Sequence, residues 1–182
     1  MISKLTRRTL GAAMMGAALM AGTATAATPD PENTLVMELK CGKVTIALRP
    51  DLAPKHVEQI KALTAKGFYD GIIFHRVIDG FMAQTGDPTG TGMGGSDLAD
   101  VKAEFTEEPF VRGTVGAARS SDPDSANSQF FIMFAEGSFL NGQYTVWGNV
   151  TEGMDCIDQI NKGEPPTDPD KIISLKILKD VN

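Results

Sequence analysis

The residues whose types and spacing could carry chemistry are concentrated in one short stretch, residues 74–87. Arg76 lies there among aromatic and aliphatic residues, and Phe81, Met82 and Gln84 follow it closely. An arginine among such residues is unusual for a strand whose only role is to pack in the hydrophobic core. The mixture suits an apolar pocket with one cation and one amide at its edge, a common composition for a site that binds a small organic group.

Most familiar catalytic centres cannot be assembled from this sequence. It has two histidines, His56 and His75, and it lacks the His-Glu-x-x-His, Cys-x-x-Cys and Gly-x-Ser-x-Gly patterns. His56 stands early in an expected helix and is interpreted as a surface or capping residue. The glycine-rich stretch 86–95 is not followed by the Lys-Ser/Thr pair of a phosphate-binding loop, which favours a surface loop. We therefore expect a reaction without metal or covalent chemistry.

The N-terminal segment has the pattern of a secretory signal peptide. Lys4, Arg7 and Arg8 precede an uncharged apolar run, and small residues after that run form a cleavage site. An uncleaved anchor is the alternative, and the adjacent arginines are also compatible with twin-arginine export. We expect a periplasmic or secreted protein. Its expected parts are a signal peptide at 1–26, a linker at 27–34 and one domain at 35–180.

The charge balance limits the classes of partner. The chain has a formal net charge of −6 at pH 7, and loss of the predicted signal peptide makes it more negative, because that segment contains basic residues and no acidic one. An acidic domain repels phosphate backbones and anionic lipid. We therefore expect no nucleic-acid partner and no stable membrane insertion after the signal is cleaved.

Two cysteines, Cys41 and Cys156, remain in the expected mature chain. An oxidising compartment would permit a disulfide between them. The sequence does not show whether they come within bonding distance. Two free, partly buried thiols stay open as the alternative, which we slightly favour.

Short apolar runs separated by glycine, proline and aspartate predict a mainly β protein. Runs at 35–39 and 44–48 predict a hairpin, and Pro54 opens a helix that Gly67 ends. Several further strands without helices between them are typical of an antiparallel barrel or sandwich. The remaining expected elements are strands at 73–77, 81–85, 114–118, 130–134 and 145–150, a short helix near 154–160 and a closing strand at 172–178.

Two longer motifs, residues 74–87 and residues 128–132, resemble the signature of the cyclophilins. Gly67-Phe68-Tyr69 and Trp147-Gly148 stand in the matching order around them, so the resemblance covers essentially residues 35–178. It implies a closed eight-stranded antiparallel β-barrel capped by two α-helices. It also implies a peptidyl-prolyl cis–trans isomerase that works without a cofactor. We expect a monomer that acts on proline-containing unfolded or flexible polypeptides and assists the folding of exported proteins.

The resemblance also assigns roles residue by residue. Arg76 is similar to the family's catalytic arginine. The implied walls of the proline pocket include Phe81, Met82, Phe131 and Leu140, and the implied substrate-binding set as a whole is Phe81, Met82, Gln84, Ala118, Gln129, Phe131, Phe139, Leu140 and Tyr144. Between Ala118 and Gln129 the chain is one residue longer than the eukaryotic pattern, a stretch that includes Arg119.

Two positions depart from the pattern of many family members. Phe139 stands where many have tryptophan, and Tyr144 stands where they often have histidine; both replacements are familiar in the bacterial branch. Because phenylalanine has no indole N–H donor, we expect cyclosporin to inhibit this protein only weakly.

Two other functions compete with catalysis. One is a binding module that keeps the groove but works as a chaperone or scaffold, and the other is an acidic envelope protein that shares only the fold. Degenerate pocket residues would favour either of them. The intact set Arg76, Phe81, Met82, Gln84 and Phe131 argues instead for an enzyme.

Overall fold

The computed structural model of the protein describes residues 28–181, so the predicted signal peptide lies outside the described residues. The order of elements matches the expected one of hairpin, helix, strands, short helix and closing strand. The bounds are β1 Thr34–Leu39, β2 Gly42–Leu48, α1 Pro54–Ala65, β3 Arg76–Ile78, β4 Met82–Thr85, β5 Thr114–Ala117, β6 Phe130–Met133, β7 Val146–Glu152, α2 Met154–Asp158 and β8 Ser174–Ile177, with 3-10 turns at Ser138–Leu140 and Leu178–Asp180.

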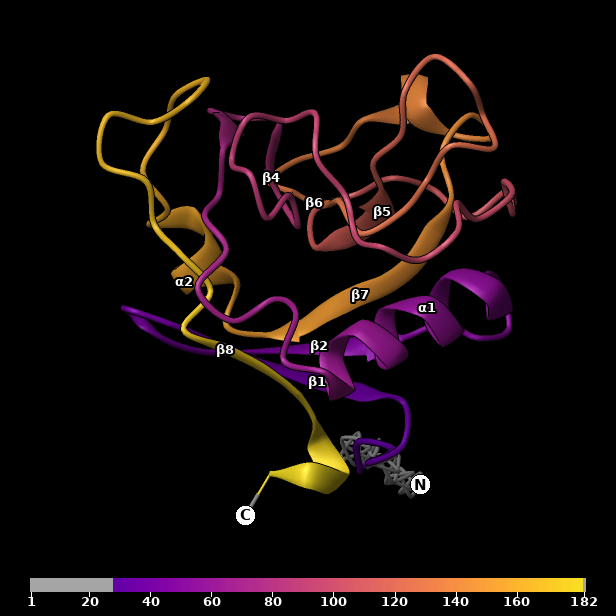
Figure 1. The fold of residues 1–182 in the computed structure, drawn as a ribbon, viewed down its shortest axis with the longest axis horizontal. Helices are drawn as coiled ribbons and strands as arrows, with labels where there is room; N and C mark the ends of the chain where they lie inside the picture. The colour runs from indigo at the N-terminus through magenta and orange to yellow at the C-terminus, as the bar shows by residue number, and fades with distance from the viewer. Residues whose placement is uncertain (1–27, 182) are drawn as a thin grey trace, which may run out of the picture.

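All eight strands form one antiparallel sheet in the order β3-β4-β6-β5-β7-β2-β1-β8. Figure 1 shows the sheet curled, with β4, β5 and β6 above, β1, β2 and β8 below, and β7 running between the two halves. The expectation of a closed barrel is wrong, because the edge strands β3 and β8 form no ladder with each other. The prediction of a mainly β fold with two helices is confirmed.

The barrel stays open because the segment before β3 pairs with a loop rather than with a strand. Within the described residues, isolated bridges join this segment and β3 to the loop before β8, Ile73 with Lys171 and Val77 with Gly163. The backbone N–H of Phe74 donates to the carbonyl of Asp170, outside any regular ladder. For the same reason the strand expected at 73–77 begins only at Arg76.

The main core lies inside the curl of the sheet, against α1. Alternate residues of a strand point to opposite faces, so Leu35 and Met37 of β1 and Ile46 of β2 point inward and are fully buried. Helix α1 presents the buried residues Val57, Ile60 and Leu63, at the spacing that aligns one face of a helix. Together they form a continuous apolar cluster that fixes the positions of the strands.

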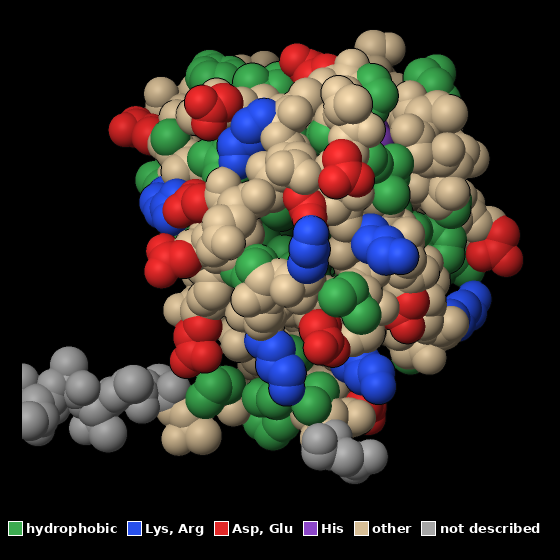
Figure 2. Space-filling view, turned by 90° about the vertical axis from the view of Figure 1, so that its left-hand side faces the viewer, with side chains coloured by type: hydrophobic (Ala, Val, Ile, Leu, Met, Phe, Trp, Pro, Cys, Tyr) green, Lys and Arg blue, Asp and Glu red, His purple; other side chains and the backbone are tan. Residues whose placement is uncertain are grey.

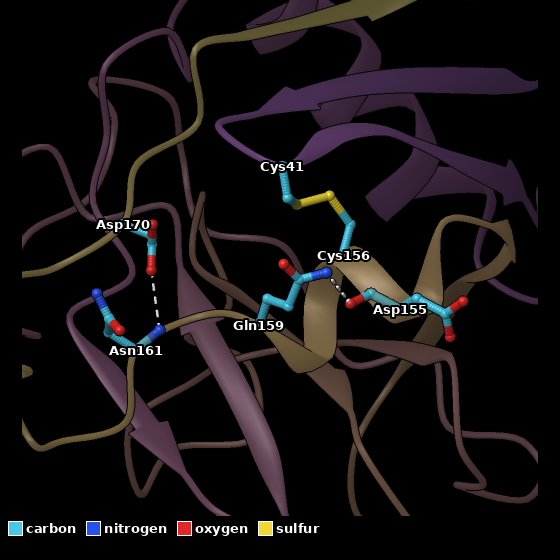
Figure 3. Close-up of a disulfide and its surroundings, with 6 residues drawn as sticks. All are labelled: Cys41, Asp155, Cys156, Gln159, Asn161 and Asp170. Atoms are coloured by element: carbon cyan, nitrogen blue, oxygen red, sulfur yellow. Dashed lines mark hydrogen bonds between the residues drawn. A yellow bond between two sulfur atoms is a disulfide. The ribbon is translucent and has the colours of Figure 1, made fainter.

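Cys41 and Cys156 form a disulfide, so the slight preference for two free thiols is wrong. Their Cα atoms are 5.6 Å apart, although 115 residues separate them in the chain. Figure 3 shows the bridge between the β1–β2 turn and α2. Pairing of β2 with β7 explains this proximity, since the end of β7 lies opposite Thr45 and α2 follows directly.

His56 is buried, with 3% of its surface exposed, so its interpretation as a surface residue is wrong. The cap of α1 comes from Glu104, whose carboxylate accepts hydrogen bonds from the backbone N–H groups of Lys55 and His56 at 3.1 and 3.0 Å. The same carboxylate lies 2.7 Å from Nδ1 of His56. Burial lowers the pKa of His56, and the hydrogen bond that its ring donates to Glu104 opposes that shift.

Charges of both signs are mixed on the molecular surface. Figure 2 shows the face that carries α2 and the loop after it, where lysine and arginine side chains lie beside aspartate and glutamate. Among residues 28–181 no helix is long and apolar enough to cross a bilayer. The described part of the chain also contains no group of three or more His, Cys, Asp or Glu side chains that could hold a metal ion.

Candidate active site

A second apolar cluster lies on the face of the sheet opposite the main core. In the pairing of β4 with β6, Met82 faces Met133 and Gln84 faces Phe131. Because the side-chain period of a strand is two, these four residues point away from the main core, whereas Ala83 between them points into it. The second cluster is therefore a direct product of strand alternation.

A pocket of about 280 Å³ opens above this cluster. Nine of the ten residues implied by the resemblance line it, and the tenth, Gln129, does not. The complete lining is Arg76, Phe81, Met82, Gln84, Ala118, Arg119, Phe131, Phe139, Leu140 and Tyr144. Residues from β3, β4 and β6, from the segment just after β5 and from the turn before β7 thus meet at one place.

The wall of the pocket is apolar and held by aromatic contacts. Met82, Phe131 and Leu140 are buried, with at most 7% of their surfaces exposed. The ring of Phe131 stacks on Phe110 at a centroid distance of 5.7 Å and meets the edge of Tyr144 at 5.8 Å. These contacts fix the ring orientation, so the wall is formed before any ligand arrives.

Phe110 does not line the pocket but stacks behind Phe131 and so supports its wall; no pattern in the sequence singled it out. It lies in a loop far from both motifs, and a Cβ added at Gly116 would come within 2.6 Å of both Phe110 and Phe131. Only glycine leaves room for the two stacked rings at this point of β5. The need for glycine at position 116 could have pointed to Phe110. That need can be recognised only when the two rings that contact Gly116 are known.

Phe139 stands at the rim of the pocket rather than in its wall. It belongs to the 3-10 turn Ser138–Leu140, and 63% of its surface is exposed. Its ring contacts Phe81 at a centroid distance of 5.5 Å. The pair leaves an exposed aromatic surface beside the opening, available to a bound chain.

Arg76 lies at the edge of the pocket, on β3, directly opposite Gln84 of β4. Its side chain is 41% exposed, and its Nε donates a hydrogen bond to Oε2 of Glu164 at 2.8 Å. Within residues 28–181 its two terminal nitrogens make no hydrogen bond. They are free to donate to a ligand, and the charge of the guanidinium persists at every physiological pH.

Gln129 supports Gln84 from behind. The amide nitrogen of Gln84 donates to Oε1 of Gln129 at 2.9 Å. The amide of Gln129 donates in turn to the carbonyls of Gly92 and Gly94 at 3.0 and 2.8 Å. Gln129 therefore lines an adjoining hollow and fixes the orientation of Gln84, instead of standing on the rim of the pocket itself.

Asp87 organises the glycine-rich loop that holds Gln129. Its carboxylate accepts hydrogen bonds from the hydroxyl and backbone N–H of Thr89 and from the N–H groups of Gly92 and Gly94. Burial by itself would raise the pKa of Asp87, but these hydrogen bonds outweigh it and lower the pKa to about 2. The predicted surface loop is thus an ordered support, with positive φ at Gly86, Gly90 and Gly92.

Known proteins resemble this chain over most of its length. The family model described as "Cyclophilin type peptidyl-prolyl cis-trans isomerase/CLD" matches residues 34–177. A probable peptidyl-prolyl cis-trans isomerase of Brucella suis is 54% identical over 190 aligned residues, which cover 96% of this chain and 97% of the relative. A peptidyl-prolyl cis-trans isomerase-like 1 protein of Aspergillus fumigatus is 37% identical and covers 80% of this chain and 96% of the relative.

Solved structures show the same fold. The cyclophilin AquaCyp293 of Hirschia baltica superimposes with a TM-score of 0.78 at 33% identity, over 85% of this chain and 77% of that one. A cyclophilin-type isomerase of Cryptosporidium parvum, crystallised in the presence of the dipeptide Ala-Pro, has a TM-score of 0.73 at 31% identity, over 79% of this chain and 98% of that one. With its curled eight-stranded sheet, its pocket and these matches, the chain belongs to the cyclophilin-type peptidyl-prolyl cis–trans isomerase family.

Proposed function

We propose that this protein isomerises X-Pro peptide bonds in the pocket beside Arg76 and so assists the folding of exported proteins. The observation that carries the proposal is the position of Arg76, whose terminal nitrogens are free at the edge of an apolar pocket. Membership of the isomerase family supports the reaction type. The relative crystallised in the presence of Ala-Pro supports a proline-containing peptide as the substrate.

The chemical problem is rotation about an amide bond. Resonance gives the X-Pro bond partial double-bond character, and the barrier is roughly 18–20 kcal/mol. Uncatalysed isomerisation therefore takes tens of seconds or longer, which can limit folding. No bond has to break, so an enzyme needs only to bind the twisted amide more tightly than either planar form.

Arg76 suits the twisted state. When the amide twists, the proline nitrogen becomes pyramidal and regains a lone pair that can accept a hydrogen bond. A terminal N–H of Arg76 would donate to it, and a hydrogen bond to a charged group contributes about 1.5–3 kcal/mol. At about 1.4 kcal/mol per tenfold in rate, this contact alone would supply roughly a ten- to a hundredfold acceleration.

The apolar wall supplies the rest of the mechanism. A proline ring is small and apolar, so Met82, Phe131 and Leu140 would hold it by burial while the flanking peptide stays outside. Gln84, oriented by Gln129, would hydrogen-bond the flanking backbone. Exclusion of water from the pocket strengthens the contact between Arg76 and the reacting nitrogen.

The proposed setting is the periplasm or the exterior of the cell, where the protein would act as a monomer. The signal-peptide pattern of residues 1–26 supports export. The Cys41–Cys156 disulfide supports an oxidising compartment, since disulfides are rare in reducing ones. Clients would be newly exported chains that still contain exposed X-Pro bonds.

The cis-to-trans rate of an X-Pro test peptide, measured with the wild type and with Arg76→Ala, tests the reaction and the role of Arg76 together. We expect a large acceleration by the wild type and a loss of about ten- to a hundredfold in kcat/KM in the variant. An inactive but folded wild type would point to a binding module. Equal activity in both proteins would exclude the proposed role of Arg76.

A further inference from the structure

Arg119 occupies the boundary between two hollows. It is the second residue after β5 and lines the proline pocket together with Ala118 and Gln84. The same three residues also line an adjoining hollow of about 630 Å³, under the glycine-rich loop. A peptide with its proline in the first hollow would therefore place a neighbouring side chain close to Arg119.

The guanidinium of Arg119 is held in place before any ligand binds. It lies over the ring of Tyr144, with its central carbon 4.4 Å from the ring centroid. Its terminal nitrogens donate to the carbonyls of Ser120 and Gln143, both at 2.9 Å. A cation fixed by an aromatic face and two carbonyls loses little further freedom when it binds an anion.

No carboxylate of the described residues neutralises this charge. The other arginines between residues 28 and 181, Arg49, Arg76 and Arg112, each form an ion pair. Arg119 forms none, and its buried Nε has no hydrogen-bond partner among the described residues. A half-buried cation without a counter-charge attracts an anion more strongly than an exposed one does.

The surroundings leave a place for such an anion. The proline pocket has two arginines and no Asp or Glu in its lining. The adjoining hollow contains one carboxylate, Asp100, which accepts a hydrogen bond from Asn127 at 2.9 Å. The arginine-flanked pocket thus contrasts with a chain whose net charge is negative.

We propose that Arg119 is a specificity-determining residue that selects clients carrying an aspartate or glutamate side chain close to the isomerised proline. The inference rests on the proposed function and refines it by naming the class of substrate. The client carboxylate accepts hydrogen bonds from the Arg119 guanidinium while the proline ring occupies the neighbouring pocket. Such charge-assisted contacts are stronger than those between neutral groups.

The test uses pairs of peptides that contain one proline and differ only by glutamate or glutamine at one position, two residues before to two residues after that proline. For the wild type at low ionic strength we expect kcat/KM to favour glutamate by about three- to tenfold at one or more positions. The ratio should fall toward one in 0.5 M salt, because salt screens a partly exposed pair.

Variants identify the residue responsible. Arg119→Gln should bring the glutamate-to-glutamine ratio to about one, and Arg119→Lys should keep part of it because the charge remains. Arg112→Gln is the matched control, since Arg112 pairs with Asp158 outside the pocket, and it should retain the wild-type ratio. Thermal melting checks that each variant is folded.

The outcomes separate the two proposals. A wild type that is inactive on every peptide would overturn the isomerase proposal and this inference with it. An active wild type with a ratio of one at every position would overturn the inference alone, and no variant is needed for that result. A preference for glutamate that persists in folded Arg119→Gln would also overturn it.

Discussion

Arg76 and Glu164 form an ion pair across the edge of the pocket, although 88 residues separate them in the chain. Glu164 lies in the loop between α2 and β8, and the preceding Gly163 exchanges two backbone hydrogen bonds with Val77, the neighbour of Arg76, at 2.8 and 2.9 Å. The loop is therefore tied to the strand that carries Arg76. The carboxylate of Glu164 accepts the hydrogen bond from Nε of Arg76, and the two terminal nitrogens of Arg76 stay available to the substrate.

Replacement of Glu164 tests this arrangement. Glu164→Ala should lower kcat/KM about two- to fivefold, because an exposed ion pair contributes at most about 1 kcal/mol. Glu164→Gln keeps an oxygen acceptor and should retain most of the activity. A folded Glu164→Ala protein with unchanged kcat/KM in the peptide assay would show that the pair does not orient Arg76.

Removal of the disulfide should affect stability and leave catalysis intact. The disulfide closes a long loop, and such a disulfide typically raises the free energy of unfolding by about 2–4 kcal/mol. The double variant Cys41→Ser, Cys156→Ser should therefore melt about 5–15 °C below the wild type. Its activity at 25 °C should be unchanged, because neither cysteine lines the pocket.

Reductant provides the control for that experiment. Dithiothreitol should lower the melting temperature of the wild type and leave the double variant unaffected. A wild type whose melting temperature does not respond to complete reduction, verified by a thiol count, would contradict the expected stabilisation.

Mild acid should destabilise the protein through its buried histidines. Burial lowers the pKa of His56 and of His75 below the usual value of 6.5. The unfolded chain then binds protons more readily than the folded one, so stability is complete at neutral pH and is lost as the pH falls below 6.5. We expect the melting temperature to fall between pH 7.5 and pH 5.5.

His56→Gln isolates one contribution to this pH dependence. The amide can still hydrogen-bond Glu104 but does not titrate, so the slope of melting temperature against pH should be smaller than in the wild type. His75 would account for the remaining slope in this range. A variant with the wild-type slope would exclude His56 as a source of acid sensitivity.

Phe139 should limit the affinity for cyclosporin. It stands at the rim of the pocket and provides no hydrogen-bond donor. We expect inhibition of the wild type to require concentrations above the nanomolar range. Phe139→Trp should tighten it about tenfold, since one added hydrogen bond contributes about 1 kcal/mol and the larger ring adds contact area. A nanomolar inhibition constant for the wild type would contradict this expectation.

Local patterns were sufficient to predict most elements and the part of the pocket within residues 74–87, whereas the rest of its lining was implied only by the resemblance to the cyclophilins. The alternation in β1 and β2, and the face formed by Val57, Ile60 and Leu63 of α1, are encoded within a few residues. The sequence also predicted that one site contains Arg76, Met82 and Gln84. A tight turn joins β3 to β4 and places these residues on adjacent strands. The signal peptide and the location outside the cytoplasm stay predictions.

The tertiary structure decided what depends on contacts between distant segments. The disulfide, the pairing of Arg76 with Glu164 and the unclosed edge of the sheet arise where segments tens of residues apart pack together. His56 became buried for the same reason, since Glu104 covers it from another segment. Periodicity and turn residues report only on neighbours in the chain. The curl of the whole sheet determines which distant side chains come into contact. A local sequence pattern therefore cannot predict these contacts.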